Sequence, residues 1–180
     1  ALKRIICPLS GQYQNKNLLT VFQVVEKLEG QDYPVSEKNI YKGIKNVVTN
    51  TGLLGRWQII GREPLTICDT GHNADGIKEI VSQIENITHS KLHFVFGMVN
   101  DKNIESVIKL LPKEADYYFC KANIPRGLDQ DELKNRCAKY KLKGESYNSV
   151  ISAYKQAIKN ADKKDLIFIG GSTFVVAEIL

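Results

Sequence analysis

Short apolar runs alternate with segments of helical periodicity along most of the chain. From Trp57 onward, apolar runs of four to six residues are bounded by turn residues, which is the pattern of short buried strands. Between these runs, apolar residues recur every three or four positions, which predicts helices packed on a sheet. We expect strands at 57–60, 65–69, 92–97, 116–120 and 165–170, and helices around 77–84, 104–111, 129–140, 149–161 and 172–180.

This alternation predicts an α/β fold. Successive strand–helix–strand units build a Rossmann-like, mostly parallel sheet with helices on both faces. The first strand, 57–60, is joined to the next by a tight turn. Because a parallel neighbour would need a long crossover, we expect this strand to be an antiparallel edge. Asp129 is the expected N-cap of the 129–140 helix, with Glu132 in the capping-box position.

The first fifty residues have a different pattern. A strand-like run at 4–7 precedes a helical segment that ends at Gly30, and Ser36 is the expected N-cap of a second helix. One strand and two helices cannot bury a core by themselves. We therefore expect residues 1–52 to be the tail of a preceding domain and 53–180 to be a domain of their own, joined at a Gly-containing hinge.

Composition and charge narrow the class of protein. Of the 180 residues, 43% are hydrophobic and 25% are charged, as is typical of a globular domain. No apolar run approaches the roughly 20 residues that span a bilayer, so we expect no membrane partner. The net charge of +5 comes from lysines spread over nearly every helix, which disfavours a nucleic-acid partner. The missing initiator Met and the strand-like start suggest a piece of a longer protein.

The cysteines indicate a reducing compartment. They are widely spaced, without a CxxC pair or a Cys/His ligand pattern, and most lie in or beside apolar runs. Free cysteine commonly behaves as a small hydrophobic residue. We expect reduced, structural thiols in a cytoplasmic protein. The four residues are Cys7, Cys68, Cys120 and Cys137.

The carboxyl ends of the expected strands select the candidate ligand loops. In open α/β sheets, ligands bind outside this edge. The edge carries the loops 69–76, 97–103, 121–127 and 170–173. Neither a P-loop nor a GxGxxG motif occurs in the sequence. The Gly-rich turn at 170–173 resembles an anion nest at a helix start, which is a weak signal by itself.

Asp69 and His72 are the most informative residues of the first loop. At the end of a strand, the Asp69 carboxylate is placed to accept both hydroxyls of a ribose. The alternative is that Asp69 or Asn73 caps the helix that follows. His72 has no second ligand at helical or loop spacing, so we expect no metal site here.

The order of the motifs resembles that of a known family. DTGHNADG at 69–76, FGMVNDKN at 96–103, IPRG at 124–127 and DLIFIGGS at 165–172 follow one another. This order is similar to that in the carboxy-terminal domain of folylpolyglutamate and dihydrofolate synthases, relatives of the muramyl-peptide ligases. Upstream, residues 9–17 resemble the G-x-[YH]-Q-x-x-N stretch at the end of the family's central ATPase domain.

The sequence also departs from the family's pattern. The family usually has Pro where Ala74 stands and often has Ala where Gly127 stands, but neither position is a proposed ligand group. The missing P-loop is the larger departure. The resemblance therefore implies that residues 1–52 are the remnant of a central ATP-binding domain, with 53–180 as the carboxy-terminal ligase domain. The P-loop and the ligands of Mg²⁺ would lie in an absent upstream part.

The resemblance implies an ATP-dependent acid–amino-acid ligase. ATP would phosphorylate the carboxylate of a folate or of dihydropteroate, and the amine of L-glutamate would attack the acyl phosphate to form an amide. We expect a monomer that works with the upstream ligase domain of the same chain, and a fragment that is inactive alone. The motifs do not separate dihydrofolate synthase from folylpolyglutamate synthase activity.

The resemblance also implies roles for individual residues. Asn17 would face the adenine, Arg56 would reach the nucleotide from the hinge, and Asp69 would hold the ribose. Lys102 fits a solvated lysine at a helix start as well as it fits a catalytic role. The remaining candidates are His72 beside the nucleotide and in catalysis, and Asn73, Asp101 and Ser172 on the glutamate and acyl-phosphate side.

Two other functions stay open at this point. The first is a muramyl-type ligase with the same chemistry and a cell-wall substrate. The second is a non-catalytic α/β module that binds a nucleotide or a partner. The pairing of the 9–17 stretch with the 69–76 loop favours the folate ligase over the muramyl-type ligase. The non-catalytic module would be favoured if the native protein began at Ala1.

Overall fold

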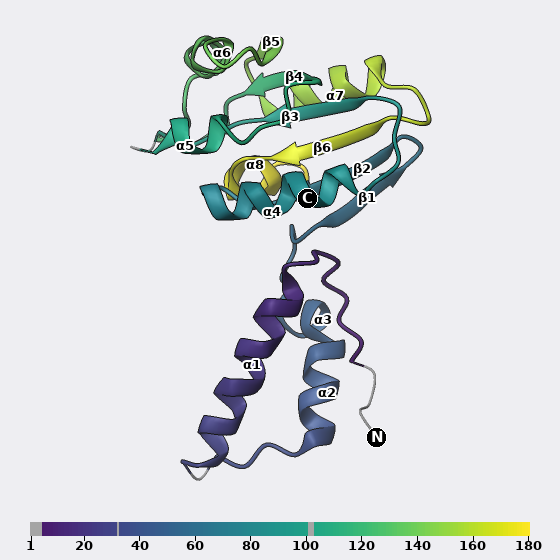
Figure 1. Ribbon diagram of the computed structural model, residues 1–180, viewed down its shortest axis with the longest axis vertical. Helices are drawn as coiled ribbons and strands as arrows, with labels where there is room; N and C mark the ends of the chain where they lie inside the picture. Colours follow the sequence, from purple (N-terminus) through teal and green to yellow (C-terminus); the bar gives the residue numbers. More distant parts are fainter. Residues whose placement is uncertain (1–4, 32, 101–102) are drawn as a thin grey trace.

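A six-stranded sheet forms the larger part of the molecule, and three helices form an arm below it (Figure 1). The computed structural model describes residues 5–31, 33–100 and 103–180. The strands are β1 (Gln58–Arg62), β2 (Leu65–Asp69), β3 (Leu92–Phe96), β4 (Ala115–Cys120), β5 (Lys143–Tyr147) and β6 (Leu166–Gly170). The helices are α1 (Gln14–Glu29), α2 (Glu37–Lys45), α3 (Val47–Thr51), α4 (Ala74–Glu85), α5 (Ile104–Ile108), α6 (Gln130–Ala138), α7 (Val150–Asn160) and α8 (Thr173–Ala177).

The sheet has the strand order β1-β2-β6-β3-β4-β5. Every neighbouring pair from β2 to β5 is parallel, whereas β1 pairs with β2 in antiparallel register. The predicted α/β fold with one antiparallel edge strand is therefore confirmed. Because the parallel strands all point the same way, the loops that follow them gather at one edge of the sheet.

Two apolar layers sandwich the sheet. On one face, α4, α5 and α6 cover the aromatic rings of the central strands, where Phe94 lies 4.9 Å from Phe168 and 5.5 Å from Tyr117 between ring centroids. On the other face, α7 and α8 pack small and β-branched side chains against the sheet. Burying each large apolar side chain contributes about 1.5–3 kcal/mol. The predicted helix face of Ile77, Ile80 and Ile84 is buried as expected.

The strand β5 was not predicted from the sequence. Its residues, KGESY, are mostly polar, and it lies at the edge of the sheet, where an apolar pattern is not required. Gly144 allows the close approach to β4, because a Cβ atom there would lie 2.0 Å from the Tyr117 carbonyl oxygen. Pairing with β4, and not local preference, makes this segment a strand.

The strand expected at 4–7 is wrong within the part of the chain that the structure describes. Residues 5–7 have no strand assignment and pair with none of the six strands. A strand needs a neighbour to receive its N–H and C=O groups. Residue 4 lies outside the described residues.

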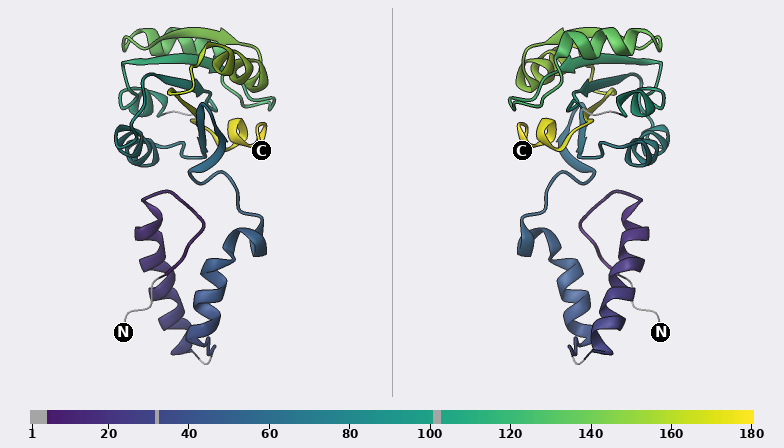
Figure 2. Two further views of the ribbon diagram at one scale, coloured as in Figure 1. Left: turned by 90° about the vertical axis from the view of Figure 1, so that its right-hand side faces the viewer. Right: turned by 90° about the vertical axis from the view of Figure 1, so that its left-hand side faces the viewer.

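The arm (residues 5–52) buries little apolar surface. In Figure 2, α1 and α2 run beside each other and diverge toward the sheet. Several large apolar side chains of α1 are exposed, with Leu19 at 66% and Val24 at 52%. Ser36 caps α2 as predicted, by accepting the Asn39 amide. Among the described residues, no helix combines the length and the apolar character needed to cross a membrane.

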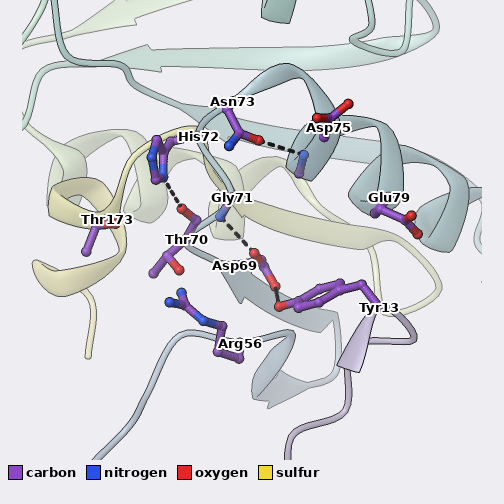
Figure 3. A pocket seen from close by; sticks show the side chains of 11 residues that line it. Tyr13, Arg56, Asp69, Thr70, Gly71, His72, Asn73, Asp75, Glu79 and Thr173 are labelled. Carbon is purple, nitrogen blue, oxygen red and sulfur yellow. Dashed lines mark hydrogen bonds between the residues drawn. The ribbon is translucent and has the colours of Figure 1, made fainter. Parts of the chain in front are cut away.

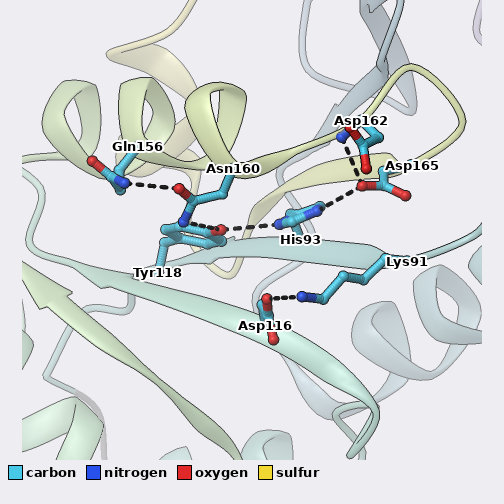
Figure 4. Close-up of polar contacts among 8 residues, drawn as sticks. All are labelled: Lys91, His93, Asp116, Tyr118, Gln156, Asn160, Asp162 and Asp165. Atoms are coloured by element: carbon cyan, nitrogen blue, oxygen red, sulfur yellow. Dashed lines mark hydrogen bonds and ion pairs between the residues drawn. The ribbon is translucent and has the colours of Figure 1, made fainter.

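A chain of buried polar groups stabilises the amino-terminal edge of the sheet (Figure 4). Fully buried His93 lies 3.1 Å from Asp165 through Nε2 and 2.9 Å from the Tyr118 hydroxyl through Nδ1. Because an ionised carboxylate only accepts, Nε2 donates to Asp165 and Nδ1 accepts from Tyr118. Asn160, at the end of α7, donates to the same hydroxyl. These bonds connect β3, β4, α7 and the turn before β6.

The carboxylate of Asp165 should make stability depend on pH. Burial raises the pKa of Asp165, but bonds from the Asp162 amide and from His93 outweigh this effect, so the pKa lies below its ordinary value of 3.8. A depressed pKa contributes stability above the unfolded-state value, and this contribution is lost as the pH falls through the folded-state value. We expect Asp165→Asn to lower the free energy of unfolding by about 1 kcal/mol at pH 7.

Denaturant unfolding from pH 7 to pH 2.5 measures the difference in the free energy of unfolding between the unaltered chain and Asp165→Asn. This difference should shrink toward zero at the lowest pH. Asp116→Asn is the matched control, because the Asp116 side chain is 47% exposed and pairs with Lys91 at the surface. A difference for Asp165→Asn that stays constant with pH would contradict the assignment.

Candidate functional site

A cleft of about 280 Å³ opens at the carboxyl end of β2 (Figure 3). It forms where the turn before α1, the hinge before β1, the loop between β2 and α4, and the start of α8 meet. This is the edge where open α/β sheets bind ligands. We call it the Asp69 cleft. Its lining residues are Tyr13, Arg56, Asp69, Thr70, Gly71, His72, Asn73, Asp75, Gly76, Glu79 and Thr173.

Asp69 stands at the centre of this cleft and is almost completely buried. Its Oδ2 accepts the Tyr13 hydroxyl at 2.6 Å and the Trp57 amide at 2.7 Å. Its Oδ1 accepts the Gly71 amide at 2.8 Å. A carboxylate has about four acceptor sites, so three donors leave one site open, on Oδ1. Asp69 therefore ties three separate segments of the chain together.

Burial and hydrogen bonding act on Asp69 in opposite directions. Burial raises its pKa, while the bonds from Tyr13, Gly71 and Trp57 and the positive charge of Arg56 lower it, and the net shift is upward. Burial and the neighbouring carboxylate also raise the pKa of the Tyr13 phenol. The phenol is therefore a proton donor, and the carboxylate is its acceptor.

The loop after β2 is held by its own polar groups. Asn73 is the N-cap of α4, since its Oδ1 accepts the Gly76 amide at 2.8 Å. The capping alternative is thus correct for Asn73 and wrong for Asp69, which bonds to Gly71 instead. The Nδ1 of His72 donates to the Thr70 carbonyl at 3.1 Å. Arg56 extends from the hinge into the same cleft (Figure 3).

Asn17 and Ser172 lie outside the lining of the Asp69 cleft. Asn17 faces a second, mainly apolar cavity of about 380 Å³ between α1 and the α2–α3 pair, where its Nδ2 donates to Gln14. Ser172 is buried and caps α8 by accepting the Phe174 amide, while its neighbour Thr173 lines the cleft. The remaining two candidates, Asp101 and Lys102, lie outside the described residues.

Tyr13 and Thr70 are among the cleft residues that carried no role in the sequence analysis. Tyr13 lies within the 9–17 motif, but nothing in the sequence pairs it with Asp69. The Oγ1 of Thr70 is buried and has no hydrogen-bond partner among the described residues. An unsatisfied buried hydroxyl is unusual in folded proteins. Thr70 is also one of the residues that line the cleft.

The described residues contain no cluster of metal-ligating side chains. Within them, no three side chains of His, Cys, Asp or Glu gather in a way that could hold an ion. Two carboxylates of the cleft are engaged by protein groups: Asp69 by three donors, and Glu79 by Lys16.

Known proteins match the chain in both sequence and fold. The Mur ligase glutamate ligase domain matches residues 55–173. The probable bifunctional folylpolyglutamate synthase/dihydropteroate synthase of Haloferax volcanii is 29% identical over 174 residues, 95% of this chain and 20% of that protein. The structure of E. coli FolC in complex with DHPP and ADP has a TM-score of 0.77 at 26% identity, covering 99% of this chain and 40% of that one. The UDP-N-acetylmuramoyl-L-alanyl-D-glutamate–2,6-diaminopimelate ligase of Prochlorococcus marinus subsp. pastoris is 24% identical over 179 residues, 93% of this chain and 34% of that protein.

A mostly parallel sheet with a cleft at its carboxyl edge defines the class of open α/β domains, in which ligands bind at that edge. Within that class, the chain belongs to the Mur ligase family and contains its glutamate ligase domain. The predicted family resemblance is thereby confirmed. The chain spans well under half the length of the relatives it matches.

The unsatisfied hydroxyl of Thr70 can be tested by its removal. Thr70→Val keeps the shape of the side chain and removes a buried polar group that has no partner. We expect the free energy of unfolding to stay the same or to rise by about 1 kcal/mol in denaturant titrations. In the matched control, Thr66→Val, a buried hydroxyl loses its bond to the Pro64 carbonyl, so stability should fall. An equal loss in both variants would show that Thr70 has a partner in the empty protein.

Proposed function

We propose that the chain is the nucleotide-facing carboxy-terminal part of an ATP-dependent ligase that joins L-glutamate to a folate or to dihydropteroate. The observation that carries this proposal is the buried carboxylate of Asp69 in a cleft with the guanidinium of Arg56. A carboxylate can accept ribose hydroxyls, and a guanidinium can bind phosphate. The structure of E. coli FolC in complex with DHPP and ADP supports the same assignment.

The proposed reaction has two steps. The γ-phosphoryl group of ATP passes to the substrate carboxylate, which gives an acyl phosphate and ADP. The amine of L-glutamate then attacks the acyl carbon, and the C–O bond to phosphate breaks as the amide forms. The residues of this chain orient the nucleotide, and the ligands of Mg²⁺ are proposed to lie in the upstream part of the ligase.

Each residue has a role in this proposal. Asp69 holds the ribose and Arg56 contacts the nucleotide. His72 lies beside the nucleotide, and its Nδ1, not its Nε2, makes the bond to the Thr70 carbonyl. The other proposed roles are adenine recognition for Asn17, contacts on the glutamate and acyl-phosphate side for Asn73, Asp101 and Ser172, and catalysis for Lys102 together with His72. For Asn73 and Ser172, the side-chain oxygens already cap helices, so these two act through the helix starts that they stabilise.

The arm fits a role as part of a second domain. We propose that residues 1–52 are the remnant of the central ATP-binding domain and that 53–180 form the carboxy-terminal ligase domain. The exposed apolar side chains of α1 support this division, because they have too little of the chain's own surface to pack against. The whole ligase is proposed to be a cytoplasmic monomer that supplies the P-loop and the Mg²⁺ ligands from its upstream part.

A muramyl-type ligase is the second candidate. The similarity to the Prochlorococcus enzyme favours it, since that match also covers nearly the whole chain. The reaction chemistry would be the same, with a cell-wall peptide in place of the folate. A purified full-length protein that ligates glutamate to dihydropteroate, and not an amino acid to a muramyl peptide, would exclude this candidate.

The ribose contact of Asp69 predicts a specific loss in the full-length ligase. A charge-assisted hydrogen bond contributes roughly 1.5–3 kcal/mol, or about tenfold to a hundredfold in binding. We expect Asp69→Asn to raise the ATP concentration needed for ligation by about that factor, because the amide group donates where a carboxylate oxygen accepts. Thermal unfolding is measured alongside, since Asp69 also bonds three internal donors.

The control for this experiment is Asp116→Asn, which changes a carboxylate at the opposite edge of the sheet and should leave the ATP dependence unaltered. A normal ATP requirement in Asp69→Asn would remove Asp69 from the nucleotide site.

The chain alone should not turn over ATP. Its sequence has no P-loop, and its described residues hold no metal cluster. We expect no Mg²⁺-dependent phosphate release above background from the purified 180-residue chain. The measurement compares the chain with Asp69→Asn prepared in the same way. Phosphate release by the unaltered chain that is lost in Asp69→Asn would contradict the proposal that the upstream part of the ligase is needed for ATP turnover.

A further inference from the structure

The hydrogen bonds of Asp69 conflict with the way a ribose would bind. Two adjacent hydroxyls need two acceptor sites, and the three internal donors leave the carboxylate with one. The side chain is also only 2% exposed. In the conformation described here, Asp69 can therefore not accept both hydroxyls. One of its present donors has to leave first.

Only one of these donors can leave without rebuilding the loops. The amides of Trp57 and Gly71 belong to the backbone of the hinge and of the loop after β2. The third donor is the phenol of Tyr13, a side chain that itself lines the cleft (Figure 3). It can swing away by a change of side-chain rotamer.

We propose that Tyr13 is a latch on the Asp69 cleft: its phenol occupies the carboxylate site that one ribose hydroxyl of a bound nucleotide would use, and it leaves when the sugar binds. This inference rests on the proposed nucleotide site and identifies a residue that sets its affinity. Without a nucleotide, the Tyr13 phenol donates a hydrogen bond to the Asp69 carboxylate. With a nucleotide bound, the ribose hydroxyls donate to that carboxylate instead.

The surroundings of Tyr13 allow the ring to move while the chain around it stays in place. The Gln12 amide donates to Gln83 of α4 at 2.8 Å, and Lys16 pairs with Glu79 on the same helix. These contacts remain when the phenol leaves. The ring packs closely over Gly11, where an added Cβ would lie 2.5 Å from a ring carbon. The Tyr13 carbonyl also accepts the amide of Asn17, the proposed adenine contact, so the latch lies next to two proposed nucleotide groups.

The test compares nucleotides with and without the diol. Binding of ADP and of 2′,3′-dideoxy-ADP to the 180-residue chain and to Tyr13→Phe is measured by titration calorimetry. Removing the phenolic hydroxyl frees an acceptor site on Asp69, so ADP should bind roughly tenfold more tightly to the variant. Dideoxy-ADP should bind both proteins alike. Tyr33→Phe, which changes an exposed ring in the same arm, is the control and should change neither affinity.

Two further measurements distinguish a latch from a hydrogen bond that only stabilises the fold. Gly11→Ala keeps the phenol but displaces its ring, so it should also tighten ADP binding. With the tyrosine phenol carbons labelled with carbon-13, the NMR signal of Tyr13 should shift when ADP binds and stay in place when dideoxy-ADP binds. The reason is reciprocity: if the bound phenol weakens ribose binding, the bound ribose weakens the contact of the phenol with Asp69 to the same extent. If the Tyr13–Asp69 bond only stabilises the fold, Tyr13→Phe would change the melting temperature and leave the ratio of the ADP affinity to the dideoxy-ADP affinity unchanged.

The possible failures are distinguishable. If the chain prefers ADP to dideoxy-ADP, and Tyr13→Phe leaves this preference unchanged or weakens it, the latch is overturned and the ribose site stands. If the unaltered chain binds both nucleotides equally, the ribose assignment of Asp69 fails and the latch falls with it. If neither nucleotide binds, the proposed nucleotide cleft itself is refuted for this chain.

Discussion

A buried carboxylate is costly unless each oxygen finds donors, and this requirement organises the functional end of the molecule. Asp69 meets it with a side chain from the turn before α1, an amide from the hinge and an amide from its own loop. The same three bonds position the hinge that carries Arg56 and the loop that carries His72. One residue therefore shapes the cleft and contributes one of the contacts between the arm and the sheet.

The two edges of the sheet use buried polar groups for different purposes. At the amino-terminal edge, His93, Tyr118, Asn160 and Asp165 satisfy one another, and the resulting network joins four elements. At the carboxyl edge, one buried polar group lacks a hydrogen bond, since the Thr70 hydroxyl has no partner among the described residues. Complete networks stabilise a fold, whereas groups left open at a cleft are available to a ligand.

The arm shows how a segment depends on surfaces beyond its own. Its helix α2 begins at the predicted cap Ser36, yet several large apolar side chains of α1 stay exposed. Contacts with α4 through Gln83 and Glu79, together with the bond from Tyr13 to Asp69, attach the arm to the rest of the described chain. The relatives it resembles are more than twice as long, which is consistent with an arm that packs on a further domain.

Hydrophobic periodicity by itself determined the α/β class, five of the six strands, the antiparallel edge and the loops at the carboxyl end of the sheet, because these follow from local spacing and from the direction of parallel strands. It missed β5, whose polar residues become a strand only through pairing with β4, and it predicted a strand at 4–7 that has no partner in the described chain.

Motif order likewise identified the family, and strand position singled out Asp69. Only the tertiary structure decided which donors reach that carboxylate, since Tyr13 lies 56 positions away in the chain. It also decided that Asn73 caps α4, that Ser172 is buried and that Asn17 faces a separate cavity. Side-chain partners and burial arise from the packing of distant segments, and no local pattern contains them.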